Sequence, residues 1–277
     1  GLGGTDASIT IPAVGISEAN GLTIKAELAN PVNATLLGGQ AKRDGSLDNG
    51  VIIHEYGHGI SNRLAGGPAN AGCLSGQEQA GEGWSDWFAL AMTAQASDTR
   101  TTTHPIGNWL FDQPINGPGI RPAPYTTNTA INGLTYDDIK NPAITEPHGI
   151  GTVFATMLWE MYWNLVDKYG YDPDLYSGNG GNNVAIQLVT DGLTFQPCGG
   201  TFIDFRDAIL TADMVDNDSA NQCDIWEAFS KRGLGYSASD GGTNGRDDGT
   251  EAYDLAPICA IDATPALIDV CKPNPAL

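Results

Sequence analysis

The sequence predicts an α+β protein that is mainly helical, with a partial β-rich segment at its N-terminus. Apolar residues recur at helical spacing in several segments from about residue 47 onward. The run 9–16 (ITIPAVGI) instead has the β-branched, alternating character of a strand. With 277 residues and 41% hydrophobic content, the chain is long enough to bury one or two substantial cores.

The elements are expected in a fixed order along the chain. The strand-like run is followed by a short helix at 17–28, which Ser17 caps. A polar stretch, 38–50, leads into the first strong helix. In a later helix Val153, Met157, Met161 and Leu165 recur at helical spacing. After residue 38, helices are expected at about 47–64, 76–95, 149–169, 182–195, 201–214 and 223–232.

Between these helices the sequence predicts loops. Residues 97–147 are rich in Pro, Asn, Thr and Gly and are expected to form a long ordered loop region, of the kind that builds a substrate cleft. Residues 237–250 are turn-like. We therefore divide the chain into an N-terminal segment, 1–38, a main region, 39–258, and a tail, 259–277, that resembles a linker or the start of a further module.

The charge balance excludes some partners. The formal net charge is −20, from 33 acidic and 13 basic residues. Such a surface repels phosphate backbones, so nucleic-acid binding is disfavoured. No run of about 18 apolar residues occurs, so no membrane span is expected. The excess of acid suits a protein that stays soluble outside cells, or it serves calcium binding, and charge alone does not separate these.

Five cysteines form no CxxC pair, which argues against a thiolate zinc knuckle. Two pairs are close in sequence, Cys198 with Cys223 and Cys259 with Cys271, and suggest two disulfides in an oxidising compartment. Cys73 is then the odd one, either free and buried or paired outside this chain.

The strongest signal is an HExxH string, residues 54–58 (HEYGH). On a helix, His54 and His58 lie one turn apart on the same face, so that both imidazoles reach one ion. Glu55 lies on a neighbouring face, where it can accept a proton from a water held by zinc. The alternative is a chance string on a structural helix, which four histidines in the whole chain make rare.

A third ligand is expected from the next helix. Glu82 and Asp86, in the string 81–86 (GEGWSD), lie four residues apart and share a helix face. Glu82 can complete a His₂Glu set, and Asp86 can accept the second N–H of a ligand histidine. The alternative, a solvated acidic pair, carries a small like-charge penalty. The longer HExxHxxGxxH signature is excluded, because Ser61 and Leu64 occupy its Gly and His positions.

Together these strings resemble the fungalysin-type metallopeptidases, which are thermolysin-like gluzincins. The resemblance runs from about Arg43 to Pro257. The matching strings are, in order, 54–64 (HEYGHGISNRL), 81–86 (GEGWSD), 146–151 (EPHGIG), 187–193 (QLVTDGL), 225–229 (IWEAF) and 231–235 (KRGLG).

The resemblance implies a thermolysin-like zincin fold with two lobes, and a secreted zinc endopeptidase made with a propeptide that acts on proteins or peptides. It supports His54, His58 and Glu82 as ligands and Glu55 as general base. It also implies that His148 stabilises the oxyanion of the tetrahedral intermediate, against the alternative of a helix-capping histidine. Arg121 is 27 residues before His148, near the spacing of a substrate-carbonyl arginine in such enzymes.

Both ends of the chain depart from the family pattern. Residues 11–37 resemble the end of a protease-associated domain, which some bacterial relatives carry before the zinc helix, so the β-rich half that floors the cleft is expected to be absent here. This leaves a second hypothesis, a catalytically impaired fragment that acts as a binding module. An exopeptidase is disfavoured, because the Gly-rich acidic motif that captures a free amino terminus is missing.

Calcium is a weaker candidate. Five residues fall at ligand positions of a calcium loop, but Gly242 replaces an expected acid, so a solvated acidic turn competes with this interpretation. A second acidic cluster groups Asp213, Asp216 and Asp218. The candidate loop ligands are Asp240, Asn244, Gly245, Asp248 and Glu251.

Overall fold

The computed structural model describes residues 18–26, 43–242 and 245–260, and the chain divides into two compact units, Gly1–Lys42 and Arg43–Leu277. In the first unit the described residues form helix α1, Glu18–Ala26. The short helix expected at 17–28 is therefore confirmed. The strand expected at 9–16, and with it the β-rich segment, lies outside the described residues, as does the Ser17 cap.

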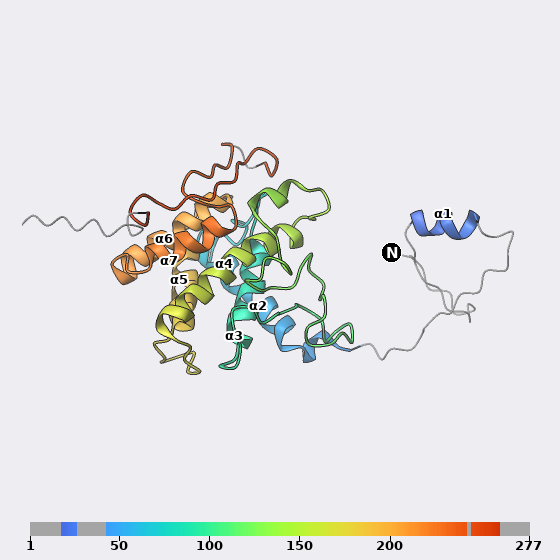
Figure 1. Ribbon diagram of the computed structural model, residues 1–277, viewed down its shortest axis with the longest axis horizontal. Coiled ribbons are helices and arrows are strands. Elements are labelled where there is room, and N and C mark those ends of the chain that lie inside the picture. The colour runs from blue at the N-terminus through green and yellow to red at the C-terminus, as the bar shows by residue number, and fades with distance from the viewer. Residues whose placement is uncertain (1–17, 27–42, 243–244, 261–277) are drawn as a thin grey trace, which may run out of the picture. The chain divides into compact units, whose positions relative to one another are not determined.

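The second unit is helical (Figure 1). Within the described part of this unit, β-structure is limited to three isolated bridges, one of which pairs His104 with Tyr125. In chain order the helices are η1 (Gly45–Leu47), α2 (Asn49–Leu64), α3 (Gly81–Thr93), η2 (Tyr136–Lys140), α4 (His148–Tyr169), α5 (Gly181–Phe195), α6 (Phe202–Asn217) and α7 (Gln222–Lys231).

Helix α4 forms the centre of this unit. Helices α3, α5 and α7 pack against it, α2 packs against α3, and α6 packs against α5. Figure 1 shows α4 running between α3 and the group of α5, α6 and α7. Nearly every residue of α4 from Gly149 to Trp163 is buried, which explains why its apolar residues exceed one helical stripe. Its Phe154 contacts the rings of Trp84, Phe202, Phe205 and Phe229.

Two close approaches between helices need glycine. A Cβ atom on Gly57 of α2 would lie 2.7 Å from Cα of Ser85 in α3. A Cβ on Gly83 of α3 would lie 2.3 Å from the carbonyl oxygen of Gly151 in α4. Side chains at these points would separate the helices, because real Cβ atoms do not approach other atoms this closely. Glycine therefore brings the backbones of α2, α3 and α4 together.

The expected helices from residue 47 onward are all present, and two of their boundaries differ by three residues or more. The helix expected from residue 76 begins at Gly81, because turns with Gly76 at φ +118° precede it. The helix expected at 201–214 continues to Asn217 and ends at Asp218, which adopts a left-handed conformation. The turn there satisfies the last carbonyls of α6, since the N–H of Asp218 bonds to Asp213.

The long region 97–147 is ordered and contains only η2 and the short bridge at His104, as its composition predicted. A buried ion pair ties it to the core. Glu160 of α4 accepts hydrogen bonds from Arg232 at 2.6 and 2.9 Å and from Lys231 at 2.8 Å. Arg232 also donates to the carbonyl of Asn132 at 2.6 Å, so the loop is held against α4 and α7.

The disulfide pairing expected from sequence proximity is wrong. The structure pairs Cys73 with Cys198 and Cys223 with Cys259. Cys73 and Cys198 are 125 residues apart, but the loops before α3 and after α5 meet, and the N–H of Gly199 bonds to the carbonyl of Cys73. The cysteine pairing therefore follows from which loops meet in the fold and not from distance along the sequence. Cys271 lies outside the described residues.

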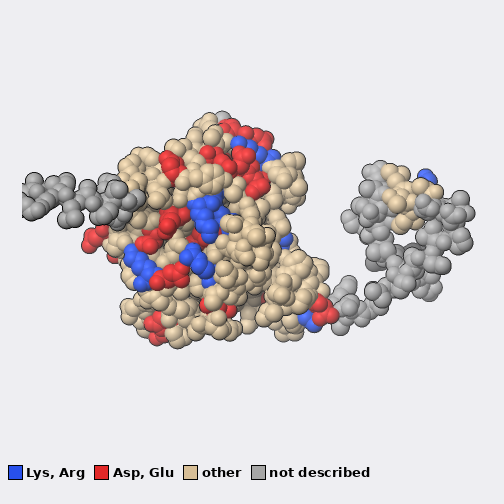
Figure 2. All heavy atoms as spheres, viewed as in Figure 1, with Lys and Arg blue, Asp and Glu red and all other residues tan. Residues whose placement is uncertain are grey.

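The surface of the second unit matches its composition. In Figure 2 acidic side chains are scattered over the visible face, and basic side chains lie among them near its middle. Basic groups of this unit are paired with acids, such as Lys168 with Asp224 and Arg100 with Asp167. None of the helices within the described ranges has the length and apolar character needed to cross a bilayer.

Candidate metal centre

Helix α2 brings two histidines to one face. Asp48 caps the helix by accepting the N–H groups of Gly50 and Val51. Six and ten residues further on, the rings of His54 and His58 lie 4.8 Å apart, nearly perpendicular to one another. His54 is buried, whereas His58 is partly open to solvent. The one-turn spacing thus produces the convergence that the sequence pattern predicts.

Glu82 approaches both imidazoles from the first turn of α3. Its Oε2 lies 3.2 Å from Nε2 of His54, and its Oε1 lies 3.6 Å from Nε2 of His58. One ligand atom from each of the three residues lies within 4.8 Å of the others. In a tetrahedral zinc site with bonds of about 2.1 Å, ligand atoms are separated by about 3.4 Å. The spacing and the N₂O donor set therefore fit zinc.

Asp86 orients the first histidine. It is fully buried one turn after Glu82, and its Oδ1 lies 2.7 Å from Nδ1 of His54. Because the carboxylate accepts the Nδ1 proton, Nε2 of His54 is the nitrogen that faces Glu82 and His58. The contact between Asp86 and Nδ1 of His54 is the one that the predicted orienting role of Asp86 requires.

The electrostatics of the site favour positive charge. Burial lowers the pKa of His54, but the hydrogen bonds to Asp86 and Glu82 outweigh it and raise the pKa to about 9. Burial raises the pKa of Glu82, but the hydrogen bond from His54 and the neighbouring histidines hold it below its ordinary value. The pKa of His58 is lowered, mainly by burial and by His54. The carboxylates thus create a negative potential at Nε2 of His54, where a cation is stabilised.

The two candidate catalytic groups, Glu55 and His148, are both exposed to solvent. Glu55 is exposed on α2, next to the ligand histidines. His148 is the first residue of α4, and its Nε2 lies 3.4 Å from Oε1 of Glu82, with 56% of the side chain exposed. Both therefore border the open side of the site. Two residues before His148, Glu146 accepts a hydrogen bond from Gln79 at 3.3 Å.

Arg121 lies deeper than its expected role suggests. Its side chain is 5% exposed and binds Asp86 through Nε at 2.7 Å and Nη2 at 2.8 Å, with Nη2 also 3.4 Å from Glu82. Burial lowers the pKa of Arg121, but its hydrogen bonds to Asp86 outweigh burial and raise the pKa, so the guanidinium stays charged. Among the described residues its contacts use Nε and Nη2, which leaves Nη1 for a further acceptor.

Sequence reasoning did not identify Tyr125, whose hydroxyl donates to Oδ2 of Asp86 at 2.6 Å. The signal available was the string 121–125 (RPAPY), where a tyrosine follows the candidate arginine by four residues. The spacing alone gives no reason to connect it with Asp86, which is 39 residues earlier.

The candidate calcium loop is differently engaged. Asp240 accepts bonds from the Thr201 hydroxyl and from its own turn at Gly242, while Glu251 accepts the N–H of Asp137. Asn244 lies outside the described residues. In the second acidic cluster, Asp213 accepts two bonds from Asn221. Across the described ranges, the group formed by His54, His58 and Glu82 is the one acidic and histidine set spaced to hold a metal ion.

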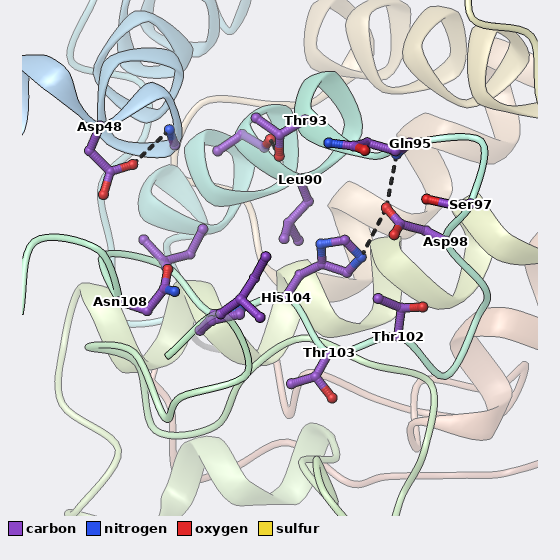
Figure 3. A pocket seen from close by; sticks show the side chains of 15 residues that line it. Asp48, Leu90, Thr93, Gln95, Ser97, Asp98, Thr102, Thr103, His104 and Asn108 are labelled. Atoms are coloured by element: carbon purple, nitrogen blue, oxygen red, sulfur yellow. Dashed lines mark hydrogen bonds and ion pairs between the residues drawn. The ribbon is translucent and has the colours of Figure 1, made fainter. Parts of the chain in front are cut away.

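A polar cavity of about 400 Å³ lies at the start of α2 and the end of α3 (Figure 3). His104 and Asp98 face one another there, with Nε2 3.6 Å from Oδ2, and the N–H of Gln95 donates to the same carboxylate. Asp48, the cap of α2, also lines the cavity, so it borders the metal-site helix at its N-terminus. Sequence reasoning did not identify this pair.

The sequence of this chain is similar to those of known metallopeptidases. A family model described as fungalysin metallopeptidase (M36) matches residues 29–238. The chain is 48% identical over 206 residues to extracellular metalloproteinase MEP of Fusarium vanettenii, covering 71% of this chain and 32% of that protein. It is 47% identical over 205 residues to extracellular metalloproteinase mep of Aspergillus terreus, and 46% identical over 204 residues to extracellular metalloproteinase 2 of Trichophyton tonsurans, with the same coverage. The chain thus spans about a third of the length of these relatives.

Proposed function

Because the chain belongs to the fungalysin metallopeptidase family, we propose that it is the catalytic region of a zinc endopeptidase that hydrolyses peptide bonds in proteins. The observation that carries this proposal is the convergence of His54, His58 and Glu82 at the spacing of a tetrahedral site. The family implies a metal, and the donor set of two imidazoles and one carboxylate favours zinc.

In this proposal His54, His58 and Glu82 hold the ion, and Asp86 fixes the tautomer of His54. Bound zinc lowers the pKa of a water to about 7 and polarises a carbonyl group. Glu55 accepts the proton of the attacking water and passes it to the leaving amine. Its exposed position beside the histidines supports this role.

Two further side chains act on the substrate. His148 donates a hydrogen bond to the oxyanion of the tetrahedral intermediate, a role that its place beside Glu82 supports. Arg121 donates to a substrate carbonyl through Nη1, while its other nitrogens stay on Asp86. A donor held in advance by buried partners loses little freedom when substrate arrives.

The biological setting is also proposed. Relatives named extracellular metalloproteinases support a secreted protein, and two disulfides agree with an oxidising compartment. We propose protein or peptide substrates and a propeptide in the precursor. Calcium at the turn 240–251 is the weaker candidate, because Asp240 and Glu251 already accept hydrogen bonds from the protein, as in a solvated acidic turn. We propose three parts for the chain: a protease-associated segment at 1–38, a main region at 39–258 and a tail at 259–277. The protease-associated segment is proposed by resemblance to some bacterial relatives, whereas the three relatives named above are fungal.

The test combines zinc stoichiometry with casein hydrolysis, using protein expressed from its complete reading frame. Glu55→Gln is expected to keep about one zinc per chain and to lower casein hydrolysis by roughly 10²–10⁴-fold, because the general base is lost. Glu82→Ala is expected to lose the zinc. Glu227→Gln, an exposed change on α7, serves as the control and should behave as wild type.

The outcomes separate the hypotheses. Wild-type casein hydrolysis in Glu55→Gln would contradict the mechanism. A wild-type protein that binds zinc but cuts no protein would favour the alternative, a binding module with an impaired site. A wild-type protein that binds no zinc would overturn the metal centre itself.

A further inference from the structure

Tyr125 ends a chain of contacts that leads to the metal site. Its side chain is fully buried, and its hydroxyl donates to Oδ2 of Asp86 at 2.6 Å. The other oxygen of Asp86 lies 2.7 Å from Nδ1 of His54. The Tyr125 hydroxyl thus holds the Asp86 carboxylate, and Asp86 in turn holds the candidate ligand His54.

The backbone of Tyr125 is fixed as firmly as its ring. Its N–H donates to the carbonyl of His104 at 2.9 Å, and its carbonyl accepts the N–H of His104 at 2.8 Å. The phenol also meets the side chain of Thr152 in α4, one turn after His148. Tyr125 therefore enters the site from a loop anchored at both backbone groups, which is the rigidity that positioning requires.

Asp86 has a second donor, but that donor has other contacts. Arg121 bonds to both oxygens of Asp86, and its Nη2 also lies 3.4 Å from the ligand Glu82. Among the hydrogen-bond donors to Asp86 that the structure describes, Tyr125 is the one with no contact to a candidate ligand or substrate. Burial raises the pKa of Tyr125 well above its ordinary value, so the hydroxyl keeps its proton.

We propose that Tyr125 is a positioning residue of the metal centre, whose hydroxyl fixes the Asp86 carboxylate against His54 and thereby strengthens zinc binding. The inference rests on the zinc site proposed above. Without the phenol, Oδ2 of Asp86 keeps only Arg121, and the carboxylate can turn away from His54. Partners that orient ligand histidines change metal affinity by 10- to 100-fold when removed.

The test is the zinc dissociation constant of Tyr125→Phe, measured by competition with a chelator in the folded protein. We expect it to rise about tenfold, the lower end of the range for such partners. Tyr136→Phe is the matched control: Tyr136 is equally buried, and its hydroxyl donates to the buried carboxylate of Glu78, whose described hydrogen bonds come from Tyr136 and Phe202 and not from the candidate metal site. It should lower the melting temperature comparably and leave zinc affinity unchanged.

A double variant tests the route through Asp86. Asp86→Asn should weaken zinc binding, and adding Tyr125→Phe should cause no further loss, because the two residues act in series. The neutral amide introduced by Asp86→Asn loses less than a carboxylate when the Tyr125 hydroxyl is missing. Asp86→Asn can therefore be compared with the double variant even if Tyr125→Phe alone does not fold.

Three results would overturn the inference: a dissociation constant for Tyr125→Phe within twofold of wild type, an equal rise in Tyr136→Phe, or an additive loss in the double variant. If wild type itself binds no zinc, the proposed function fails first. If wild type binds zinc and Tyr125→Phe binds it equally well, only the role of Tyr125 fails.

Discussion

At the scale of single residues, Glu78 stands out as a buried carboxyl group with no cationic partner among the described residues. It is 1% exposed, and its oxygens accept hydrogen bonds from the Tyr136 hydroxyl and from the N–H of Phe202. Burial raises the pKa of Glu78 to about 7, and the nearby carboxylates Asp240 and Asp248 add to the shift. The folded protein therefore keeps a proton that an unfolded chain loses near pH 4.5.

This shift predicts a pH-dependent stability. Between about pH 4.5 and 7 the folded state binds more protons at Glu78 than the unfolded state, so the free energy of unfolding falls as pH rises, by about 3 kcal/mol in total. Glu78→Gln removes this titration. Urea unfolding at pH 5 and pH 8 should show that the free energy of unfolding of the variant, relative to that of wild type, is higher at pH 8 than at pH 5. If exposed Glu227→Gln gives the same gain, the effect does not come from Glu78.

The buried ion pair of Glu160 gives a second residue-scale prediction. Glu160→Gln leaves Arg232 and Lys231 without their carboxylate, and Arg232 is 1% exposed. Uncompensated buried charge costs about 3–5 kcal/mol of stability. As control, Asp137→Asn breaks the exposed pair with Lys140 and should cost less than about 1 kcal/mol. Chemical denaturation measures both, and equal losses would contradict the expectation.

At the scale of elements, the crossing of α2 over α3 decides whether the histidines reach Glu82. Gly57→Ala places a Cβ 2.7 Å from Cα of Ser85, so the helices must separate. We expect a loss of about 1–3 kcal/mol of stability and weaker zinc binding. Gly59→Ala, two residues later in α2, meets only the end of Arg63 at 3.7 Å and should stabilise the helix by up to about 1 kcal/mol. Thermal unfolding and zinc titration of both variants test this contrast.

The helices themselves could be predicted because their signals are local. The spacing of Val153, Met157 and Met161 marks α4, and the motif 54–58 marks the face of α2 that carries the site. The start of α3 was placed too early because the residues before Gly81 have helix-compatible types but form turns around Gly76. The contact of Asp86 with His54 was also expected, since four-residue spacing on one helix limits where the carboxylate can point.

At the scale of the whole molecule, the two disulfides close loops of different length. The chain-entropy model gives about 5 kcal/mol for the 125-residue separation of Cys73 and Cys198, and about 4 kcal/mol for the 36-residue separation of Cys223 and Cys259. Replacing the first pair by alanine should therefore destabilise the protein more than replacing the second. Urea unfolding of the two double variants measures the difference. A larger loss for the shorter loop would contradict the entropic account.

Contacts of this range are what the sequence could not provide. The pairing of Cys73 with Cys198 and the bond from Tyr125 to Asp86 depend on how the region 97–147 and the loops around α5 return to the helices. No periodicity connects Asp86 with Tyr125 or Cys73 with Cys198. These contacts follow from tertiary packing, so only coordinates define them.

The meeting of Gly83 with Gly151 carries one more consequence. A Cβ on Gly151 would lie 2.8 Å from Cβ of Glu82, so the joint between α3 and α4 is directly beside the candidate ligand and one turn beyond His148. The two backbones are in direct contact there, so the distance between α3 and α4 does not depend on any side-chain conformation. The backbone therefore sets the distance between Glu82 and His148 of α4, and a side chain at either glycine would push the two residues apart.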